Sequence, residues 1–346
     1  MHVLLLVVLL PLVLGSVLTA VSGARRRAWT ASIAGTITAA SLAVLLSQAP
    51  TVFSGVPVME QWAWVPSLGL DITFRLDGLS LLFVGLILCI GLCIVLYAAY
   101  YLAPEDSAPK FYSLMMLFMA AMLGVVLSDN LLVLVVFWEL TSISSFLLVG
   151  YWGHRPDARA GARQALAVTG GGGLAMLGGF VLLGQIGGSH EISVLATRAA
   201  QIQADPLFLP ALLLILLGAF TKSAQFPFHF WLPDAMAAPT PVSAYLHSAT
   251  MVKAGVFLLM RLYPILAGSG WFEALVSGAG RVTVLFAAFI AIFKHDLKGL
   301  LAYSTVSHLG LVEYLIGLSS PLAAVAAVFH VLNHAAFKAS LFMITG

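Results

Sequence analysis

Hydrophobic stretches that are each long enough to cross a lipid bilayer occupy most of this chain. A membrane-spanning helix needs about 20 mostly apolar residues. The sequence holds about eleven such stretches, at 3–22, 29–47, 78–101, 111–128, 130–150, 164–186, 206–236, 241–264, 275–293, 299–318 and 321–345. Because lipid offers no hydrogen-bond partner to an open backbone, successive spans of this length form helices. The expected fold is therefore an all-α integral membrane protein.

The composition excludes several classes of protein. Of the 346 residues, 61% are apolar and only 9% are charged, against about 25% charged residues in an average soluble domain. So few charges cannot solvate the surface of a soluble enzyme. A net charge of +2 also lacks the basic face that a nucleic-acid binder needs. The sequence contains no phosphate-binding loop, Cys-x-x-Cys pair or haem motif, so we expect no bound cofactor, assign no metal site and do not expect an enzyme.

Two of the apolar stretches carry unusual residues. The seventh, 206–236, is crowded in its second half by proline, which removes a backbone donor and breaks a helix. Because broken helices at membrane depth survive only inside protein or beside a wet cavity, we expect a discontinuous helix 7. The sixth stretch contains the tetraglycine Gly170–Gly173, which permits close helix packing or a local distortion. The longer connections 48–76 and 187–205 are predicted to hold amphipathic pieces that lie on the surface.

The basic residues predict the orientation. The first stretch lacks a basic segment before it and is followed by Arg25–Arg27, so it is a membrane span and not a cleaved signal peptide. With the N-terminus outside, nine cations fall in inner loops and four in outer loops, in agreement with the positive-inside rule. The inner set is Arg25, Arg26, Arg27, Lys110, Arg155, Arg159, Arg163, Lys294 and Lys298, and the outer set is Arg75, Arg198, Arg261 and Arg281.

Four charged side chains fall inside apolar stretches, namely Glu139, Lys222, Lys253 and Lys338. Each would cost about 2.5–3.5 kcal/mol at the centre of a span, or on the order of 10 kcal/mol together. They must therefore be paired, neutralised or hydrated, and such residues mark ion or proton pathways by default. The alternatives are an acid tied to a neighbouring helix for Glu139 and a lysine that reaches the cytoplasmic surface for Lys222.

His247 and Lys253 lie in the eighth stretch, six residues apart, and so do not share one helix face. They can still contribute to one proton relay through Ser248, Thr250 or water. The alternative for His247 is an interior histidine whose ring is satisfied by its neighbours.

The last stretch contains the sharpest local pattern. His330, His334 and Lys338 have the spacing i, i+4, i+8 and stand in a file of about 12 Å on one helix face. Because histidine titrates near neutral pH, this file predicts a proton relay, with packing or a metal site as alternatives. We also count Lys298 as a candidate, although its cluster with Lys294, His295 and Asp296 is typical of interface anchors. His308 and Glu313 are weaker candidates, because their spacing places them roughly 140° apart on one helix.

These motifs resemble a known family. The residues KSAQFPFHFWLPDAMAAPTPVSA at 222–244, DLKGLLAYSTVSH at 296–308 and HVLNHAAFK at 330–338 are similar to the antiporter-like membrane subunits of Mrp-type cation/proton antiporters, respiratory complex I and membrane-bound hydrogenases. The resemblance covers most of the chain after about residue 77.

Details favour the A subunit of the multisubunit Mrp Na⁺/H⁺ antiporter within this family. Glu139 stands in Phe-Trp-Glu-Leu-Thr-Ser, where the complex I subunit more usually has Trp-Glu-Gly. Position 253 is lysine, where that subunit typically has threonine. Ala237 and Ala238 stand where it usually has Glu-Gly.

The resemblance implies a role for each candidate residue. Glu139 and Lys222 would be an acid and lysine whose separation modulates the proton affinity of the lysine. His247 and Lys253 would continue the relay toward the centre, and His330, His334 and Lys338 would carry it along a polar axis. Lys298 is included for proton transfer and coupling. The broken helix would be one of an inverted pair, as in many transporters.

The resemblance also implies an organisation and partners. Residues 1–346 would be one polytopic membrane domain, with peripheral first helices and an outer loop at 1–76 and an antiporter-like core at 77–346. The family has about fourteen core helices, so we expect the chain to be the N-terminal part of a longer subunit, inactive alone. Its partners would be the other subunits of a hetero-oligomeric complex, membrane lipid, H⁺ and Na⁺ or Li⁺, in a bacterial plasma membrane.

Three functions are compatible with the residues. In the leading one, an inward proton gradient drives Na⁺ or Li⁺ outward through a secondary antiporter. In the alternative, the chain is the proton-pumping membrane subunit of a complex I-like redox enzyme, and its energy comes from other subunits. A helical scaffold without transport is the third, but a scaffold has no reason to keep a line of polar residues at the midplane.

Overall fold

The computed structural model describes residues 3–21, 27–65, 67 and 70–346. Its long elements are α1 (Val3–Leu9) and α2 (Ser16–Val21), joined by a π-helical segment (Leu10–Gly15), α3 (Arg27–Phe53), β1 (Val58–Val65), β2 (Leu70–Leu76), α4 (Gly78–Tyr101), α5 (Ala108–Leu127), α6 (Leu131–Val149), α7 (Pro156–Gly187), α8 (Ile192–Ala196), α9 (Ala199–Ala204), α10 (Phe208–Lys222), α11 (Trp231–Asp234), α12 (Thr240–Ser248), α13 (Lys253–Leu266), α14 (Trp271–Ile292), α15 (Leu297–Gly317) and α16 (Pro321–Ile344). Each of the eleven predicted stretches contains helix.

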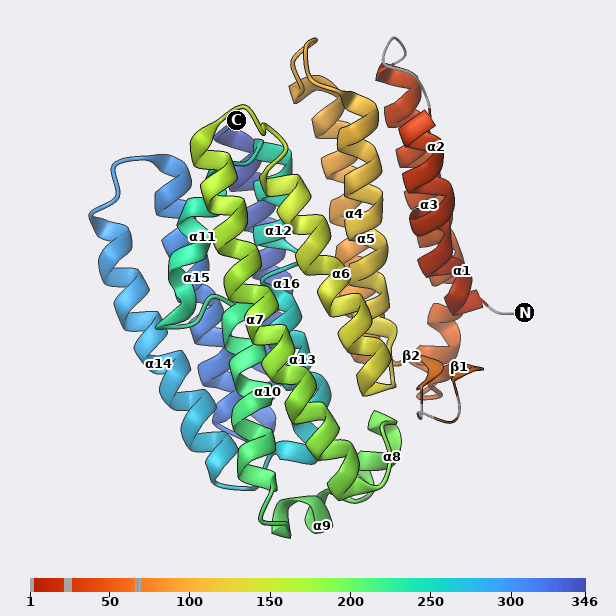
Figure 1. Ribbon diagram of the computed structural model, residues 1–346, viewed down its shortest axis with the longest axis vertical. Helices are drawn as coiled ribbons and strands as arrows, with labels where there is room; N and C mark the ends of the chain where they lie inside the picture. Colours follow the sequence, from red (N-terminus) through yellow and green to blue (C-terminus); the bar gives the residue numbers. More distant parts are fainter. Residues whose placement is uncertain (1–2, 22–26, 66, 68–69) are drawn as a thin grey trace.

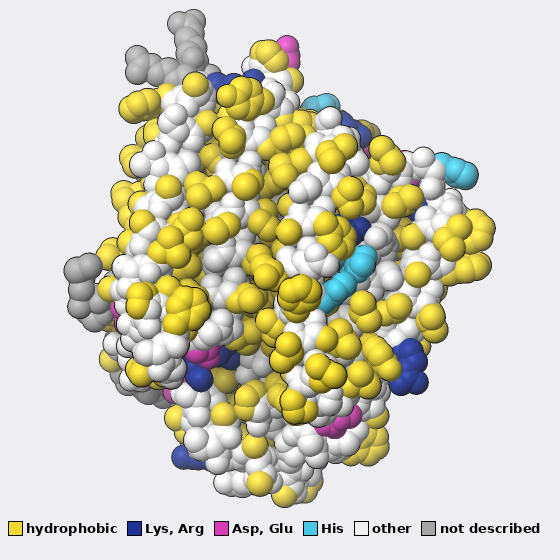
Figure 2. All heavy atoms as spheres, turned by 180° about the vertical axis from the view of Figure 1, so that it is seen from behind, with side chains coloured by type: hydrophobic (Ala, Val, Ile, Leu, Met, Phe, Trp, Pro, Cys, Tyr) yellow, Lys and Arg dark blue, Asp and Glu magenta, His cyan; other side chains and the backbone are white. Residues whose placement is uncertain are grey.

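Within the described residues, nine helical segments are long and apolar enough to cross a membrane. The two remaining predicted stretches correspond to α10, which is apolar but only 15 residues long, and to α15. The face of the molecule in Figure 2 is covered largely by hydrophobic side chains, with few charged ones between them. The predicted class, an all-α multi-pass membrane protein, is confirmed.

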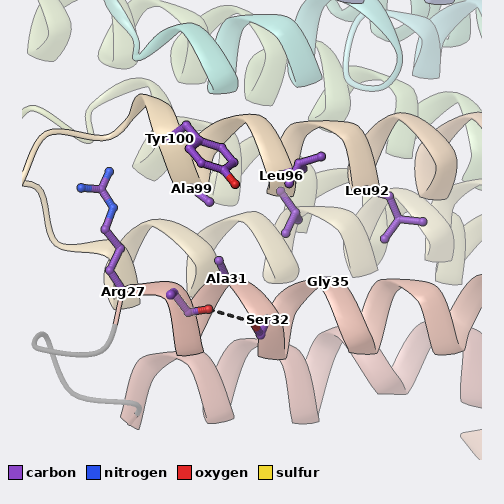
Figure 3. A pocket seen from close by; sticks show the side chains of 10 residues that line it. Arg27, Ala31, Ser32, Gly35, Leu92, Leu96, Ala99 and Tyr100 are labelled. Carbon is purple, nitrogen blue, oxygen red and sulfur yellow. Dashed lines mark hydrogen bonds between the residues drawn. The ribbon is translucent and has the colours of Figure 1, made fainter.

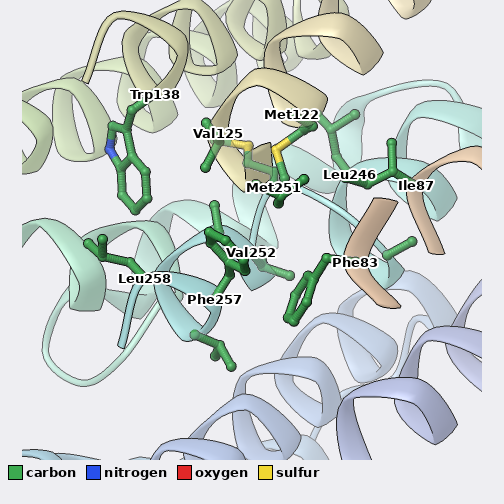
Figure 4. Close-up of a cluster of buried hydrophobic side chains, with 14 of the residues drawn as sticks. Phe83, Ile87, Met122, Val125, Trp138, Leu246, Met251, Val252, Phe257 and Leu258 are labelled. Carbon is green, nitrogen blue, oxygen red and sulfur yellow. The ribbon is translucent and has the colours of Figure 1, made fainter. Parts of the chain in front are cut away.

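The helices form a bundle with α1–α3 at one edge, beside α4 and α5 (Figure 1). Next to them, α7 packs against both α6 and α10, and α14, α15 and α16 pack in sequence on the far side. The hydrophobic core lies between α4, α5, α6, α12 and α13. Phe83, Met122, Trp138, Leu246 and Phe257 meet there, each almost fully buried (Figure 4).

The predicted interruption of helix 7 is confirmed. Helix α10 ends at Lys222, and α12 begins only at Thr240; between them lie the single helical turn of α11 and two short 3-10 segments, Phe228–Phe230 and Ala235–Ala237. Proline residues at 227, 233 and 239 remove the donors that a continuous helix would need. The indole N–H of Trp231 donates to the carbonyl oxygen of Thr221 at 2.9 Å, and so satisfies one carbonyl freed by the break.

A second interruption was not predicted. The eighth stretch is divided between α12, which ends at Ser248, and α13, which begins at Lys253. No proline marks this break in the sequence. The ammonium of Lys253 donates to the carbonyl oxygen of Ser248, which the end of α12 leaves without a helical partner. A charged donor thus takes the place of the missing backbone donor.

The connection 48–76 differs from the prediction. Instead of an amphipathic surface piece, α3 continues to Phe53, and β1 and β2 then form an antiparallel hairpin in which Trp62 is opposite Ile72. Side chains of β1 alternate largely between half-buried and exposed, as expected of a strand with one covered face. The connection 187–205 does contain two short helices, α8 and α9. Their apolar residues Leu195 and Ile202 are fully buried, so these helices pack onto the protein.

The connections α4–α5, α6–α7 and α14–α15 lie at one end of the bundle, and the hairpin, α8 and α9 lie at the other (Figure 1). Most of the predicted inner cations belong to the first end, although Arg25 and Arg26 are outside the described residues. Two predicted outer-loop cations are not in loops. Arg261 is buried within α13 and Arg281 lies within α14, its guanidinium over the ring of Tyr314. A stretch that contains a single arginine still has a high mean hydropathy, so hydropathy did not show whether that arginine lies in a helix or in a loop.

An apolar groove runs between α3 and α4 on the outside of the bundle (Figure 3). Small residues of α3, Ala31 and Gly35, face Leu92 and Leu96 of α4, with Arg27 at one end. The groove contains none of the candidate site residues.

Candidate functional site

Lys222 is the last residue of α10, and its side chain is completely buried against α6. Its Nζ donates to Ser142 Oγ at 2.8 Å and to the carbonyl oxygen of Trp138 at 3.4 Å. The ammonium also lies 5.2 Å from the centre of the Trp138 ring, a favourable cation–π distance. Trp138 and Ser142 are four residues apart, so one face of α6 supplies all three contacts. These partners offset part of the free-energy cost of burying an ammonium at this depth.

Glu139 is in the middle of α6, but its carboxylate does not contact Lys222. No ion pair joins these two residues in the described structure, and Oε1 of Glu139 is buried without a hydrogen-bond partner. The two charges are nevertheless close enough to interact electrostatically. The structure therefore brings the predicted acid and lysine together as neighbours, with the lysine hydrogen-bonded to α6 and the acid free. We call Glu139, Lys222, Ser142 and Trp138 the acid–lysine site.

His247 and Lys253 flank the break between α12 and α13, and both are buried. Neither ring nitrogen of His247 has a hydrogen-bond partner, and its ring lies 6.1 Å from that of Trp231. Ser248 and Thr250 were predicted to connect these two residues. Of the two, Ser248 contacts Lys253, through its backbone carbonyl. The hydroxyl of Thr250 instead donates to the carbonyl oxygen of Tyr245 at 2.7 Å.

His330 and His334 lie on the face of α16 that packs against α15, and there they meet His308. His308 Nδ1 and His330 Nε2 are 3.0 Å apart, and the ring of His308 lies 5.4 Å from that of His334. We call His308, His330 and His334 the histidine cluster. His334 is almost fully buried, whereas His308 and His330 are half-buried.

The two remaining candidates bind backbone carbonyls of other segments. Buried Lys338 donates to the carbonyl oxygen of Leu301 at 3.2 Å, which joins α16 to α15. Half-buried Lys298 donates to the carbonyl oxygen of Ala238 at 3.3 Å, which joins α15 to the end of the interrupted segment. Lys298 is not part of the histidine cluster.

Sequence reasoning ranked two residues too low. His308 completes the histidine cluster, but its partners are on another helix, so spacing along its own helix could not reveal them. Glu313 is fully buried in α15, beside Ser223, and neither of its carboxylate oxygens has a hydrogen-bond partner of ordinary geometry. The hydroxyl of Ser142 was also missed, because a serine in an apolar stretch is an ordinary residue until its neighbour is known.

An ion-pair network joins the residues before α4 to α13. Asp77, the residue before α4, accepts two hydrogen bonds from Arg261 of α13, at 2.6 and 3.1 Å. Arg75 contacts both Asp77, at 3.2 Å, and Asp129, at 3.6 Å. Burial alone would raise the pKa of Asp77, but the hydrogen bonds and charge of Arg261 outweigh it and hold that pKa below its ordinary value.

Two family patterns match the chain. The family described as "NADH:quinone oxidoreductase/Mrp antiporter, TM" matches residues 128–346, and "NADH-Ubiquinone oxidoreductase (complex I), chain 5 N-terminus" matches residues 62–112. The first match includes every candidate site residue.

Relatives that are similar over most of the chain are named as antiporter subunits. The chain is 59% identical to a probable A/B subunit of a K⁺/H⁺ antiporter of Rhizobium meliloti over 90% of its length, which is 31% of the relative. It is 53% identical to the A subunit of a Na⁺/H⁺ antiporter of Alkalihalophilus pseudofirmus over 82% of its length, which is 37% of the relative. The chain thus spans about a third of the length of these curated relatives.

Solved structures agree with these matches. The Mrp complex from Dietzia sp. DQ12-45-1b contains a chain that is 38% identical, with a TM-score of 0.85 over 97% of this chain and 37% of that one. A membrane-bound sulfane sulfur reductase, an archaeal respiratory complex, has a chain with a TM-score of 0.87 over 99% of this chain and 56% of that one, but at 23% identity it shows the fold alone. The predicted resemblance is confirmed. The chain belongs to the NADH:quinone oxidoreductase/Mrp antiporter family of membrane subunits, in which the two relatives above are named as an A/B and an A subunit of cation/proton antiporters.

Proposed function

We propose that this chain is the proton-translocating part of a multisubunit cation/proton antiporter, in which H⁺ uptake drives the efflux of Na⁺ or Li⁺. The observation that carries the proposal is the acid–lysine site itself, a buried lysine bound to α6 beside an acid without a partner. Residues 77–346 would form the antiporter-like core and residues 1–76 a peripheral part. The longer subunit would work with other subunits in a bacterial plasma membrane, with its N-terminus outside.

The geometry supports proton transfer in a simple way. Ser142 and the Trp138 carbonyl accept hydrogen bonds from Lys222, and these bonds favour the charged form of the lysine. Any movement of α10 away from α6 removes these acceptors, and a buried ammonium without acceptors is unfavourable. A proton on Lys222 would then pass to the next titratable group of the proposed proton path. His247, Lys253 and the histidine cluster provide such groups near the breaks in the helices, with Lys298 and Lys338 coupling neighbouring segments.

The transported cation is part of the proposal. Relatives from Alkalihalophilus pseudofirmus and Staphylococcus aureus are named as Na⁺/H⁺ antiporter subunits, which favours Na⁺ as the substrate. The 59% identical relative from Rhizobium meliloti is named as a K⁺/H⁺ antiporter subunit, so K⁺ is the second candidate.

The test uses everted vesicles that contain the complete complex, with the lumen acidified by respiration and followed with a pH-sensitive dye. Addition of NaCl should alkalinise the lumen in the wild type and not in Glu139→Gln. Glu105→Gln, which changes an exposed loop acid, is the matched control and should behave as wild type. A response to KCl but not NaCl would change the cation to K⁺. Acidification driven by an electron donor to the purified complex, without any cation response, would replace the antiporter with the redox-pump alternative.

A further inference from the structure

The tetraglycine of α7 lies between the two helices of the acid–lysine site, and its four positions are not equivalent. A methyl group placed on Gly173 would overlap Oε1 of Glu139 and lie 3.0 Å from its carboxyl carbon. One placed on Gly172 would overlap Oγ1 of Thr221 and lie 2.8 Å from its Cβ. A methyl on Gly171 would meet nothing within 4 Å, and one on Gly170 would make only ordinary contacts.

The two crowded glycines face different helices. Gly173 is turned toward α6, where the carboxylate of Glu139 rests directly on the backbone of α7. Gly172 is turned toward α10, where it contacts Thr221, the residue before Lys222. Thr221 is itself fixed in place, because its hydroxyl donates to the carbonyl oxygen of Gly218 at 2.9 Å and its own carbonyl accepts from Trp231. A displacement of Thr221 would therefore displace the end of α10.

Other glycines of α7 have a simpler role. A methyl on Gly179 would lie 2.8 Å from the carbonyl oxygen of Ala211 and 3.0 Å from the backbone nitrogen of Ile215, so this glycine allows two helix backbones to approach. At Gly173 the space is filled by the carboxylate of Glu139, and that carboxylate has an oxygen without any hydrogen-bond partner.

We propose that Gly172 and Gly173 are positioning residues, which set the separation of the Glu139 carboxylate from the Lys222 ammonium. One stretch of α7 backbone faces the Glu139 carboxylate and also Thr221, the residue before Lys222, so a change in this stretch alters the distance between the two charged groups. This inference rests on the proposed function only in treating Glu139 and Lys222 as members of the proton path. Of the four glycines, only Gly172 and Gly173 have this positioning role, and Gly170 and Gly171 do not.

The experiment compares alanine variants in the complete complex, in everted vesicles, with the antiport rate measured per assembled complex across a range of pH. Gly173→Ala should lower the rate by about tenfold or more, because misplacement of a reacting group by about 1 Å has effects of this size. Its remaining activity should have a shifted pH profile, by about half a unit or more. Gly172→Ala should act in the same direction, and Gly171→Ala should match the wild type.

Two further variants separate positioning from folding. Gly179→Ala should reduce the amount of assembled complex, while the complex that does assemble keeps the wild-type pH profile. In the double variant E139D/G173A, the shorter acid leaves room for the added methyl, so part of the rate lost in Gly173→Ala should return.

The inference is overturned if Gly173→Ala behaves like Gly171→Ala, or if it only reduces assembly, as expected for Gly179→Ala. Failure of rescue by E139D, in a G173A complex that assembles normally, would also overturn it. These results are distinct from failure of the proposed function, which would appear as normal antiport in Glu139→Gln.

Discussion

The acid–lysine site and the histidine cluster are held in place in different ways. At the acid–lysine site the two charged groups do not touch, and each is located by a different neighbour: Ser142 for Lys222 and Gly173 for Glu139. In the histidine cluster, the rings contact one another directly, with His308 and His330 joined at 3.0 Å. Burial does not separate the two sites, because each contains a fully or almost fully buried group, Lys222 or His334, together with half-buried ones.

This difference indicates different sensitivities. Where separate neighbours position two groups, a change in any neighbour alters the distance between the groups, so the energetics of the pair can be adjusted by small helix movements. Where rings are bonded directly, the loss of one ring breaks the connection, but small movements matter less. Substitutions at the two sites are therefore expected to have different consequences.

Lys222→Met should have the largest effect. Methionine keeps the length and apolar stem of the side chain but removes the group that holds the proton, so antiport should fall by about a hundredfold or more, in line with the loss of an acid–base group. Na⁺-driven alkalinisation of everted vesicles provides the measurement. Lys110→Met, which changes an exposed lysine near the start of α5, should have no effect. Retention of more than about a tenth of the rate in Lys222→Met would contradict the assignment of this lysine to the proton path.

His308→Phe should have the next largest effect, a loss of about tenfold. Phenylalanine preserves the ring that packs against His334 and Phe337 but removes the nitrogen that meets His330. Because His308 and His330 share one interaction, the double variant with His330→Phe should be no worse than either single change. His295→Phe, at an exposed position, is the control. If the loss of antiport rate in the double variant is the product of the two single losses, the two histidines act independently and the contact between their rings does not connect them.

Ser142→Ala should have a moderate effect that is specific to pH. The hydroxyl accepts a hydrogen bond from Lys222, and this bond is stronger when the lysine is a charged ammonium than when it is a neutral amine. Its removal therefore disfavours the charged form, and the lysine releases its proton at lower pH. A hydrogen bond to a charged group contributes about 1.5–3 kcal/mol, which moves the pH of half-maximal antiport downward by about one to two units. Ser144→Ala, whose hydroxyl bonds only the backbone of α6, should leave the profile unchanged. An upward movement, or none, would show that Ser142 does not stabilise the charged lysine.

Asp77→Asn should have the smallest effect on transport and act on stability instead. The pKa of Asp77 is lowered in the folded protein, despite burial, by the hydrogen bonds and charge of Arg261. The carboxylate therefore stabilises the fold above the ordinary aspartate value of about 3.9, and this contribution is lost as pH falls through the lower folded-state pKa.

Thermal unfolding of the detergent-solubilised complex between about pH 3 and pH 6 tests this expectation. Asp77→Asn should lower the unfolding midpoint at the upper end of the range and reduce its dependence on pH, with normal antiport per folded complex. Asp157→Asn, which alters an exposed ion pair with Arg155, should change the midpoint less. Equal midpoints for wild type and Asp77→Asn would show that the pair with Arg261 does not stabilise the bundle.

The span pattern was largely predictable, since it depends on local composition. Each apolar stretch of about 20 residues has one stable state in lipid, and the proline residues marked the break after α10. The break before Lys253 and the hairpin at 58–76 were missed. The first has no proline and depends on a bond from Lys253 to Ser248. The second depends on the pairing of two strands, which neither segment indicates alone.

The candidate residues could be located from sequence for a related reason. A charge within an apolar stretch carries an unfavourable transfer free energy wherever it is placed, so Glu139, Lys222, Lys253 and Lys338 were evident from one sequence. Their partners were not, because hydrogen bonds between helices depend on how the helices are packed and turned. The tertiary structure decided that Lys222 binds Ser142 and not Glu139, that His308 meets His330, and that Gly173 lies beneath the Glu139 carboxylate. The hydropathy of a segment depends only on the residues of that segment and can be read from the sequence. Each of these contacts joins segments that are distant in the sequence and meet only when the chain folds.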